Sequence, residues 1–303
     1  MASLETQIGP LTLKNPVLTA SGTFGYGNEM ANWLDIGVLG AVICKTVTRQ
    51  PRAGNAPPRT CETAGGMLNA IGLQNVGLER FRKEKLPYLR ECGAPVVVNV
   101  AGETVEDFAF LCRALSEEEG IAAIELNISC PNVAHGLDFA TDPGLAEDVL
   151  AHARRATTLP LFAKLSPNVT DISIIAKAAE RGGADALSVA NTFVGMAIDT
   201  RTRRPRISNI TAGLSGPAVK PLALRAVWKC ASAVKIPIIG VGGITSAQDA
   251  LEFIIAGATA VQVGTATFAQ PRAAHDVIEG IESYLDQRGF GSVSELVGSF
   301  QTS

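Results

Sequence analysis

The sequence predicts an α/β fold, a (β/α)8 TIM barrel with a short N-terminal hairpin and long active-site loops. Eight short apolar runs recur along the chain, helix-like segments separate them, and 303 residues is enough chain for eight such units. Length alone would also allow two small domains. A doubly wound sheet is the alternative, but it does not usually need eight parallel strands in sequence. We therefore expect one domain over residues 1–303.

The predicted strands are continuous runs rich in Val, Ile and Ala. Such runs are typical of parallel strands that are buried on both faces. In chain order they are residues 17–21, 41–46, 96–102, 122–129, 161–166, 186–192, 238–243 and 260–265.

The segments between the runs carry helix signals. Thr104 can cap one helix, Asp142-Pro143 places proline at the first position of another, and Ser246 opens a third. Gly257 stands where a glycine is expected to end that third helix. Near the N-terminus, residues 5–16 predict a small hairpin that closes the bottom of the barrel.

Two of the segments that connect the predicted strands, residues 47–81 and 193–216, are long. The first of them is polar and rich in glycine and proline, and the second is similar. Loops of that length in a compact domain are usually functional. The second segment contains the one dense basic run, residues 201–206, which we expect to be a solvated loop.

Composition excludes several classes of protein. Hydrophobic residues make up 47% of the chain and charged residues 18%, so a sizeable core can form and no disorder signature is present. The net charge of −3 argues against a nucleic-acid or anionic-membrane surface, because both need basic patches. No apolar run approaches the roughly 20 residues of a membrane span, and the N-terminus shows no signal-peptide pattern. We expect a cytoplasmic protein that binds neither nucleic acid nor membrane.

The six cysteines, at positions 44, 61, 92, 112, 130 and 230, form no CxxC pair. A zinc site or an iron–sulfur cluster held by this chain is therefore not expected, and we predict no metal ligand. Free thiols suit a reducing cytosol, and an isolated cysteine is usually a small buried hydrophobe. Cys130 differs from the other five, because it stands among amides in the motif NISCPN at the end of a predicted strand.

Polar side chains stand at the carboxyl ends of the predicted strands, where a barrel has its active site. Two lysines, Lys45 and Lys164, share these ends with Asn99, Asn127 and Asn191. This is not core composition, because a buried unpaired lysine is costly.

The last two predicted strands end in glycine, at Gly242-Gly243 and Gly264-Thr265. Glycine lets the backbone approach a ligand, and the amides at the start of the next helix point to the same place. In a barrel this predicts a phosphate site.

Taken together, these motifs resemble those of the dihydroorotate dehydrogenases, and the resemblance runs nearly end to end. It rests on ASGTFGYG (20–27), KTVT (45–48), MLNAIGLQN (67–75), NISCPN (127–132), KLSPN (164–168), NT (191–192), GLSGPAVKP (213–221) and GVGGI (240–244). Many motifs in one order make the resemblance specific. It implies a TIM barrel that carries FMN and oxidises (S)-dihydroorotate to orotate in pyrimidine biosynthesis.

Within that family the chain is most similar to class 1, type B (NAD-linked) catalytic subunits. Cysteine in NISCPN marks class 1, since the membrane-associated class has serine there, and type A enzymes usually have NS where this chain has Asn191-Thr192. One departure is His135-Gly136-Leu137, where type B loops often carry Gly-Gly. The resemblance implies a homodimer of this chain within a heterotetramer, whose electron-transfer subunit holds FAD and a [2Fe–2S] cluster.

The resemblance also implies roles for individual residues. Cys130 is the general base, and His135 and His152 are assigned no catalytic role. The predicted substrate contacts are Lys45, Asn69, Ala70, Ile71, Gly72, Leu73, Asn127, Asn132, Asn191 and Thr192. The predicted FMN contacts are Ser21, Lys45, Thr46, Asn99, Asn127, Lys164, Ala190, Gly216, Gly242, Gly243, Gly264 and Thr265.

Several alternatives stay open at this point. A fumarate-linked type A enzyme and an FMN barrel acting on dihydrouracil would share most of these motifs. A non-redox phosphate-binding barrel, an isomerase or a lyase, would show no flavin absorbance. A purely structural barrel would be unaffected by loss of the Cys130 thiol.

Overall fold

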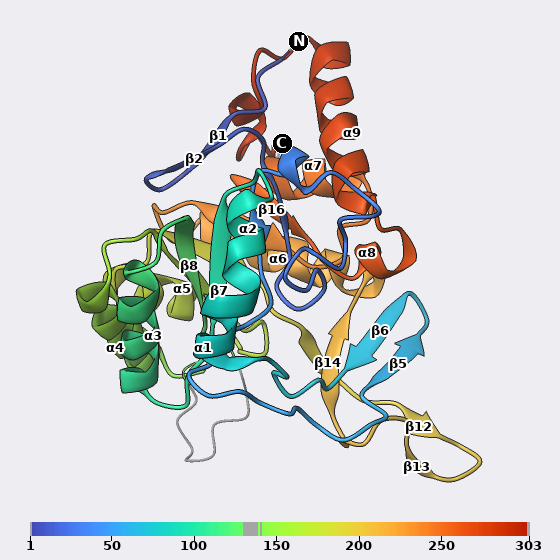
Figure 1. Ribbon diagram of the computed structural model, residues 1–303. Coiled ribbons are helices and arrows are strands. Elements are labelled where there is room, and N and C mark those ends of the chain that lie inside the picture. The colour runs from blue at the N-terminus through green and yellow to red at the C-terminus, as the bar shows by residue number, and fades with distance from the viewer. Residues whose placement is uncertain (1, 130–138, 140, 302–303) are drawn as a thin grey trace.

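A parallel eight-stranded sheet forms the centre of the molecule (Figure 1). The computed structural model describes residues 2–129, 139 and 141–301. Every predicted run contributes a strand: β3 (Val17–Thr19), β4 (Val42–Ile43), β7 (Val96–Val100), β8 (Ile121–Asn127), β9 (Leu161–Lys164), β10 (Ala186–Val189), β15 (Ile238–Val241) and β16 (Ala260–Val263). Their order is β3-β16-β15-β10-β9-β8-β7-β4, and a parallel bridge between Leu18 and Ala41 joins the two ends. The TIM barrel is confirmed.

Helices connect successive strands and cover the outside of the barrel. Those of the described residues are α1 (Gly77–Arg80), α2 (Leu86–Glu91), α3 (Val105–Ser116), α4 (Pro143–Ala156), α5 (Ile172–Arg181), α6 (Lys220–Ala231), α7 (Ala247–Ile255), α8 (Ala266–Ala269) and α9 (Ala273–Arg288). A π-helical turn (Phe81–Lys85) lies between α1 and α2, and 3-10 turns form at Ile36–Val38, Pro217–Val219 and Val293–Leu296. None of these helices is long and apolar enough to cross a membrane.

The predicted helix caps are confirmed. Thr104 Oγ1 accepts a hydrogen bond from the backbone N–H of Asp107 at 3.2 Å, and the Asp142 side chain caps α4 in the same way. Ser246 and Asp249 form a capping box at the start of α7. Gly257 follows the last turn of that helix with φ +117°, a conformation that favours glycine.

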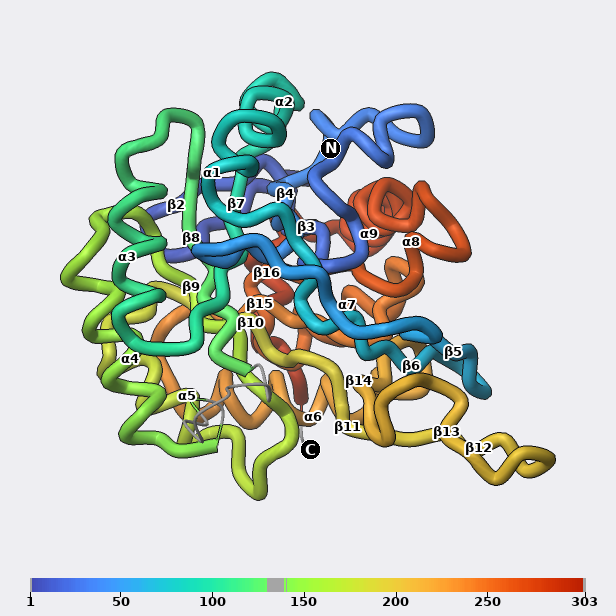
Figure 2. Tube along the Cα trace, turned by 60° about the horizontal axis from the view of Figure 1, so that its bottom comes forward, coloured from blue at the N-terminus to red at the C-terminus, as the bar shows by residue number. Residues whose placement is uncertain are grey.

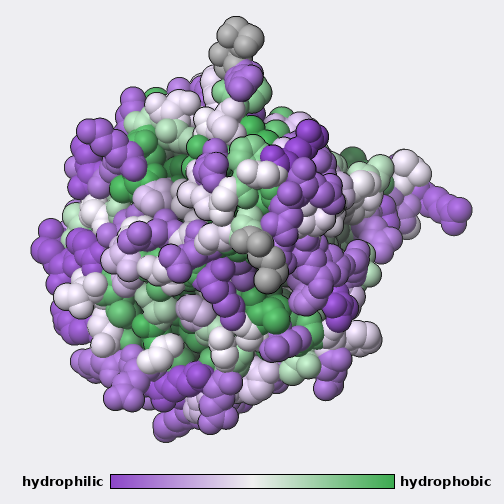
Figure 3. Space-filling model, turned by 90° about the horizontal axis from the view of Figure 1, so that it is seen from above, coloured by the Kyte–Doolittle hydropathy of each residue, from purple (hydrophilic) through white to green (hydrophobic). Residues whose placement is uncertain are grey.

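The N-terminal hairpin, β1 (Thr6–Ile8) and β2 (Leu11–Leu13), closes one end of the barrel, as predicted. Ile8 and Leu13 are fully or almost fully buried there. They join a cluster with side chains from the strands: Leu18, Ile43, Val97, Ala123, Phe162, Ala186, Ile239 and Ala260. Figure 3 shows this end of the molecule, where hydrophilic residues cover most of the surface and small apolar areas lie between them.

The two long connecting segments meet over the opposite end, which the sequence did not predict. Their short strands β11 (Phe193–Gly195), β14 (Ala212–Ser215), β6 (Gly66–Asn69) and β5 (Thr60–Thr63) form one antiparallel sheet in that order. We call it the mouth sheet; it lies beside the carboxyl ends of the barrel strands (Figure 2). A separate hairpin, β12 (Ile198–Asp199) and β13 (Arg204–Pro205), projects from it and carries the exposed basic run 201–206.

Candidate active site

A cavity of about 720 Å³ opens at the carboxyl ends of the barrel strands and is bordered by the mouth sheet. The volume lies within the range of small-molecule and cofactor sites, roughly 300–1,000 Å³. The predicted site residues that the structure describes all line it: Ser21, Lys45, Thr46, Asn69, Ala70, Ile71, Gly72, Leu73, Asn99, Asn127, Lys164, Ala190, Asn191, Thr192, Gly216, Gly242, Gly243, Gly264 and Thr265. Cys130, Asn132 and His135 lie outside the described residues.

An amide cluster stands where β8 and β10 end. Asn191 Nδ2 donates to Asn127 Oδ1 at 3.3 Å and also to the hydroxyl of Ser129, which itself donates to Asn127 Oδ1 at 2.8 Å. Asn191 Oδ1 accepts the backbone N–H of Thr192 at 2.8 Å. Both N–H hydrogens of Asn191 are therefore used within the protein, whereas its Oδ1 keeps one lone pair that can accept from a ligand. Asn127 Nδ2 donates to no acceptor among the described residues, so it remains available to a ligand in the cavity.

The mouth sheet brings Asn69, the last residue of β6, and Thr192, the residue before β11, to the cavity. Asn69 Nδ2 donates to the carbonyl of Gly213 at 3.4 Å, across the β6–β14 pair. A Cβ added at Gly213 would lie 2.1 Å from Thr192 Oγ1, so only glycine allows this close approach. Asn168 links the loop after β9 to the start of β11. Its Nδ2 donates to the Thr192 carbonyl at 3.0 Å, and its Oδ1 accepts the N–H of Val194 at 2.9 Å.

Lys45 is a half-buried cation on the cavity wall. Burial lowers the pKa of the Lys45 ammonium, and the nearby Arg59 lowers it further, while Glu29 acts in the opposite direction. No carboxylate of the described residues lies within ion-pair distance of its Nζ. A ligand anion would supply the missing partner, since opposite charge favours the charged form of a lysine.

Glycines and hydroxyl groups line the part of the cavity near β15 and β16. Gly243 has φ +76°, and a Cβ there would lie 2.8 Å from the backbone nitrogen of Lys220 at the start of α6. Thr265 Oγ1 donates to Ser215 Oγ at 2.8 Å. Within the described part of the chain, the backbone N–H groups of Gly243 and Thr265 donate to no protein acceptor. Unpaired backbone donors beside hydroxyl groups suit a phosphate.

Lys164 reaches the cavity from the end of β9 and is 5% exposed. Its Nζ donates to Gln262 Oε1 at 3.4 Å and lies 3.9 Å from Glu125 Oε1. Glu125 is fully buried inside the barrel. The ammonium group therefore has a buried counter-ion on the protein side and the cavity on the other.

Comparison with known proteins places this chain in a family. The family model described as dihydroorotate dehydrogenase matches residues 3–285. Curated relatives named "Dihydroorotate dehydrogenase B (NAD(+)), catalytic subunit" align over almost their whole length. The protein from Trichlorobacter lovleyi is 55% identical over 300 residues, covering 99% of each chain. Those from Geotalea uraniireducens and Geobacter sulfurreducens are 54% and 53% identical, each covering at least 98% of both chains.

The chain belongs to the dihydroorotate dehydrogenase family. The names of these relatives agree with the class 1, type B resemblance that the motifs predicted.

Sequence reasoning missed three buried polar residues of this dehydrogenase barrel: Glu125, Ser188 and Gln262. Each is fully buried and lies within a barrel strand. A signal for them exists in the sequence, because each interrupts an otherwise apolar strand: Glu125 in AAIELNIS, Ser188 in ALSVANT and Gln262 in AVQVGT. Buried polar groups require partners, so three such interruptions in parallel strands predict a shared network.

The cysteines that the structure describes behave as predicted for buried thiols, with one exception. Cys44, Cys61, Cys112 and Cys230 are buried, whereas Cys92 is partly exposed. Burial raises the pKa of Cys44, Cys112 and Cys230 to about 12. None of these three thiols can act as a base near neutral pH.

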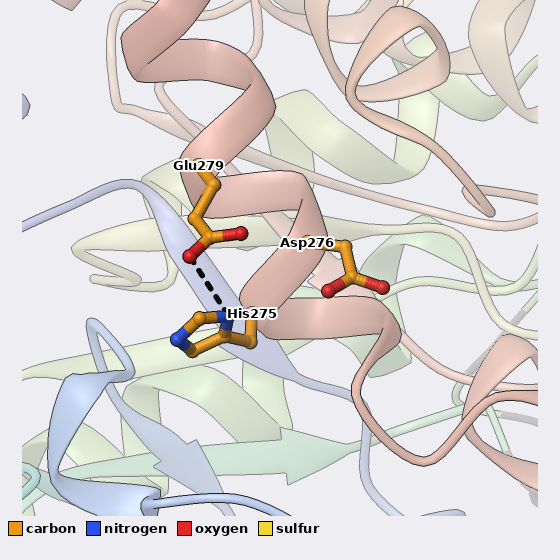
Figure 4. A group of neighbouring side chains, drawn as sticks. All are labelled: His275, Asp276 and Glu279. Carbon is orange, nitrogen blue, oxygen red and sulfur yellow. Dashed lines mark ion pairs between the residues drawn. The ribbon is translucent and has the colours of Figure 1, made fainter.

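One group of potential metal ligands stands on α9, outside the residues that line the dehydrogenase cavity. One atom each of His275, Asp276 and Glu279 lies within 4.8 Å of the others. Figure 4 shows His275 facing Glu279 across an ion pair of 3.5 Å, whereas the Asp276 carboxylate points away from them and accepts a hydrogen bond from Gln270. Protein partners thus occupy these groups, and we assign no metal. His152 lies mid-helix in α4, beside Asp148, and does not line the cavity.

Proposed function

We propose that this chain oxidises (S)-dihydroorotate to orotate in pyrimidine biosynthesis, as the FMN-binding catalytic subunit of a type B enzyme. The single observation that carries the proposal is the cavity, which gathers two cations, an amide cluster and a glycine-rich phosphate cradle at the barrel mouth. The relatives' name supports the reaction and the acceptor. We further propose that residues 1–303 act as one cytoplasmic domain.

The residues present fit FMN. The backbone donors of Gly243 and Thr265, with Gly216, Gly242 and Gly264, would hold the phosphate. Ser21, Thr46, Asn99, Asn127 and Ala190 would line the ring and its sugar-alcohol chain, with Lys45 and Lys164 supplying positive charge. When bound, FMN supplies the acceptor for the hydride that leaves C6 of the substrate.

The substrate is a planar ring with alternating N–H and C=O groups and one carboxylate. Side-chain amides offer both donors and acceptors, so Asn69, Asn127, Asn132 and Asn191 suit the ring, with Thr192 beside them. Lys45, together with the backbone N–H groups of residues 71–73, suits the carboxylate. Among the described residues, Asn127 Nδ2 has no acceptor and the Lys45 ammonium has no ion-pair partner, which supports this assignment.

Cys130 is assigned the remaining task, removal of the C5 proton. The support for this role is the motif NISCPN and the family resemblance, since Cys130 lies outside the described residues. Ser129, the preceding residue, is buried in the amide cluster and lines the cavity. In the sequence Pro131 follows Cys130, and a proline disfavours helical backbone at the residue before it.

The electrons leave through a partner in this proposal. An electron-transfer subunit that carries FAD and a [2Fe–2S] cluster would pass them to NAD⁺, within a heterotetramer built on a dimer of this chain. Two observations support the division of labour: the relatives are named catalytic subunits, and this sequence has no CxxC pair.

The reaction is tested with the purified chain and a dye as electron acceptor. We expect a yellow protein whose FMN is bleached by dihydroorotate and not by dihydrouracil. A colourless protein that takes up no FMN would contradict the flavoenzyme and favour a non-redox phosphate-binding barrel. Faster bleaching by dihydrouracil would instead support an FMN barrel that acts on dihydrouracil.

The acceptor is tested separately by reconstitution. The isolated chain should reduce dyes but not NAD⁺, and NAD⁺ activity should appear when the partner subunit is added. Fumarate reduction by the isolated chain at a rate comparable to the dye rate would instead indicate a type A enzyme.

A further inference from the structure

Glu125 is a fully buried carboxylate at the centre of the barrel. Its Oε1 accepts a hydrogen bond from Asn99 Nδ2 at 2.6 Å. Its Oε2 accepts from Gln262 Nε2 at 2.8 Å and from the hydroxyl of Ser188. Three donors and the ammonium group of Lys164 surround it, which is the environment of an ionised, acceptor-only carboxylate. The proposed reaction gives Glu125 no role, although a buried charge is costly unless it is paired.

The hydrogen bonds that end at Glu125 impose a direction on a chain of side chains. Asn99 Nδ2 must face the carboxylate, so Asn99 Oδ1 faces the other way and accepts from Thr46 Oγ1 at 2.6 Å. The single hydroxyl hydrogen of Thr46 is used in that bond. In the 3.3 Å contact between Ser21 Oγ and Thr46 Oγ1, Ser21 is therefore the donor.

This direction determines what the cavity wall offers to a ligand. The hydroxyl hydrogen of Ser21 points into the protein, so its oxygen meets the cavity as an acceptor. Lys164 is held from the protein side by Gln262 Oε1 and Glu125, so its remaining hydrogens meet the cavity as charged donors.

We infer that Glu125 is the positioning residue of the cofactor site: it holds the Lys164 ammonium and sets the direction of the Ser21–Thr46–Asn99 hydrogen-bond chain, so that the wall presents one fixed pattern of donors and acceptors to the flavin. The inference rests on the proposed function for the identity of the ligand. The network itself rests on contacts among the chain's own residues.

The substitution that tests this is Glu125→Gln, which keeps the shape of the side chain and removes its charge. A glutamine amide would place an N–H₂ group against one of the three donors that now converge there. Either the Asn99 amide flips and the direction of the Ser21–Thr46–Asn99 hydrogen bonds is reversed, or a buried donor is left unpaired. In both cases Lys164 loses its buried counter-ion.

The experiment is a double-mutant cycle on Glu125→Gln and Lys164→Met, read out as the dissociation constant of FMN by quenching of flavin fluorescence. Each single variant should weaken FMN binding about tenfold or more, where tenfold corresponds to about 1.4 kcal/mol. If Glu125 acts through Lys164, Glu125→Gln should weaken binding much less in the Lys164→Met protein than in the wild type. Equal weakening in both backgrounds would overturn the Lys164 part of the inference, and no weakening in the wild type would overturn all of it.

Glu118→Gln is the matched control. The Glu118 carboxylate accepts hydrogen bonds from Arg82 at 2.6 Å and Arg90 at 2.8 Å, and it does not line the cavity. Its loss should leave the FMN dissociation constant unchanged, although two strong hydrogen bonds are removed.

Urea unfolding of the four flavin-free proteins separates the inference from the proposed function. The destabilisation in the double variant should be smaller than the sum of the two single effects, because each single change leaves one buried charge without its partner. If the wild type binds no FMN but this coupling is present, the proposed function fails and the Glu125–Lys164 pair stands. Additive unfolding effects would refute the pair whether or not FMN binds.

Discussion

Lys164 Nζ lies 3.9 Å from Glu125 Oε1, and both side chains are almost completely removed from solvent inside the barrel. The two residues come from neighbouring strands, β9 and β8, whose register pairs Lys164 with Asn127. Asn127 lies two positions after Glu125, and side chains two apart on a strand share a face. One strand thus supplies the counter-ion of the lysine and a cavity-lining amide from the same face.

The buried apolar cluster beneath the N-terminal hairpin should contribute to stability without affecting the reaction. Ile8 is fully buried in the cluster that closes the barrel, at the opposite end from the cavity. Ile8→Ala should therefore lower the free energy of unfolding by about 3 kcal/mol and leave the KM for dihydroorotate unchanged. Urea unfolding and steady-state kinetics measure the two effects. Gln7→Ala, at the exposed neighbouring position, is the control that should change neither; an altered KM for Ile8→Ala would contradict the separation.

The capping box of α7 makes the stability depend on pH. Burial of Asp249 opposes its ionisation, but hydrogen bonds from Lys220, Thr245 and Ser246 outweigh this and lower the pKa of Asp249 to about 2. Because the folded pKa lies below the unfolded value of about 3.9, the stabilisation is fully present above pH 4 and is lost as the pH falls toward 2.

Asp249→Asn should therefore lower the free energy of unfolding at pH 7 by about 1 kcal/mol, a value reduced for the partial exposure of the site. The difference from the wild type should shrink when urea unfolding is repeated at pH 3. Glu84→Gln removes a carboxylate from an exposed ion pair with Arg80 and should have little effect at any pH. A deficit for Asp249→Asn that stays constant with pH would contradict the ionic origin.

The barrel could be predicted from the sequence because each strand is a local signal. A run such as VVVNV is buried on all sides, and its composition alone reports that. The caps at Thr104 and Ser246 are local as well. The mouth sheet could not be predicted, because its strands have three or four residues each and pair across long stretches of sequence: Asn69 and Gly213 are 144 positions apart.

Some residues of the candidate site could likewise be predicted from the sequence, and others could not. Residues at strand ends, such as Lys45 and Lys164, could be placed at the cavity because a barrel brings all carboxyl ends of its strands to one face. Glu125 could not be assigned its neighbours, because its donors Asn99, Ser188 and Gln262 come from three different strands. Which inward-facing side chains meet depends on strand register, which no motif in the sequence reports.

If Cys130 is the base, loss of its thiol should lower turnover, whereas loss of another thiol should not. Cys130→Ala should lower kcat by about 100- to 10,000-fold while FMN binding is retained, because proton transfer and cofactor binding use different groups. In the wild type, kcat should rise with pH toward about 8.5, the pKa of an ordinary thiol. Cys230→Ala is the control: burial raises the pKa of that thiol to about 12, and its removal should leave the pH profile unchanged. Full activity of Cys130→Ala would refute the base.

Lys45 should make substrate binding weaken at alkaline pH. Burial, followed by repulsion from Arg59, lowers the pKa of Lys45 below that of an ordinary lysine, about 10.4. A carboxylate binds the protonated form, so the affinity for orotate should fall as the pH rises through this lowered pKa. Lys45→Met should weaken orotate binding at pH 7 about tenfold or more and flatten its alkaline pH dependence, as measured by titration at several pH values.

The same variant should also stabilise the protein when no ligand is bound. A folded-state pKa below the unfolded value means that the charged lysine opposes folding at pH values below the unfolded pKa, so removing the charge at pH 7 raises the midpoint of urea unfolding. Lys83→Met, at an exposed position on the π-helical turn, should change neither orotate binding nor stability. A Lys45→Met protein that binds orotate as tightly as the wild type would show that the substrate carboxylate lies elsewhere in the cavity. One that is destabilised would show that the ammonium has a partner in the folded protein.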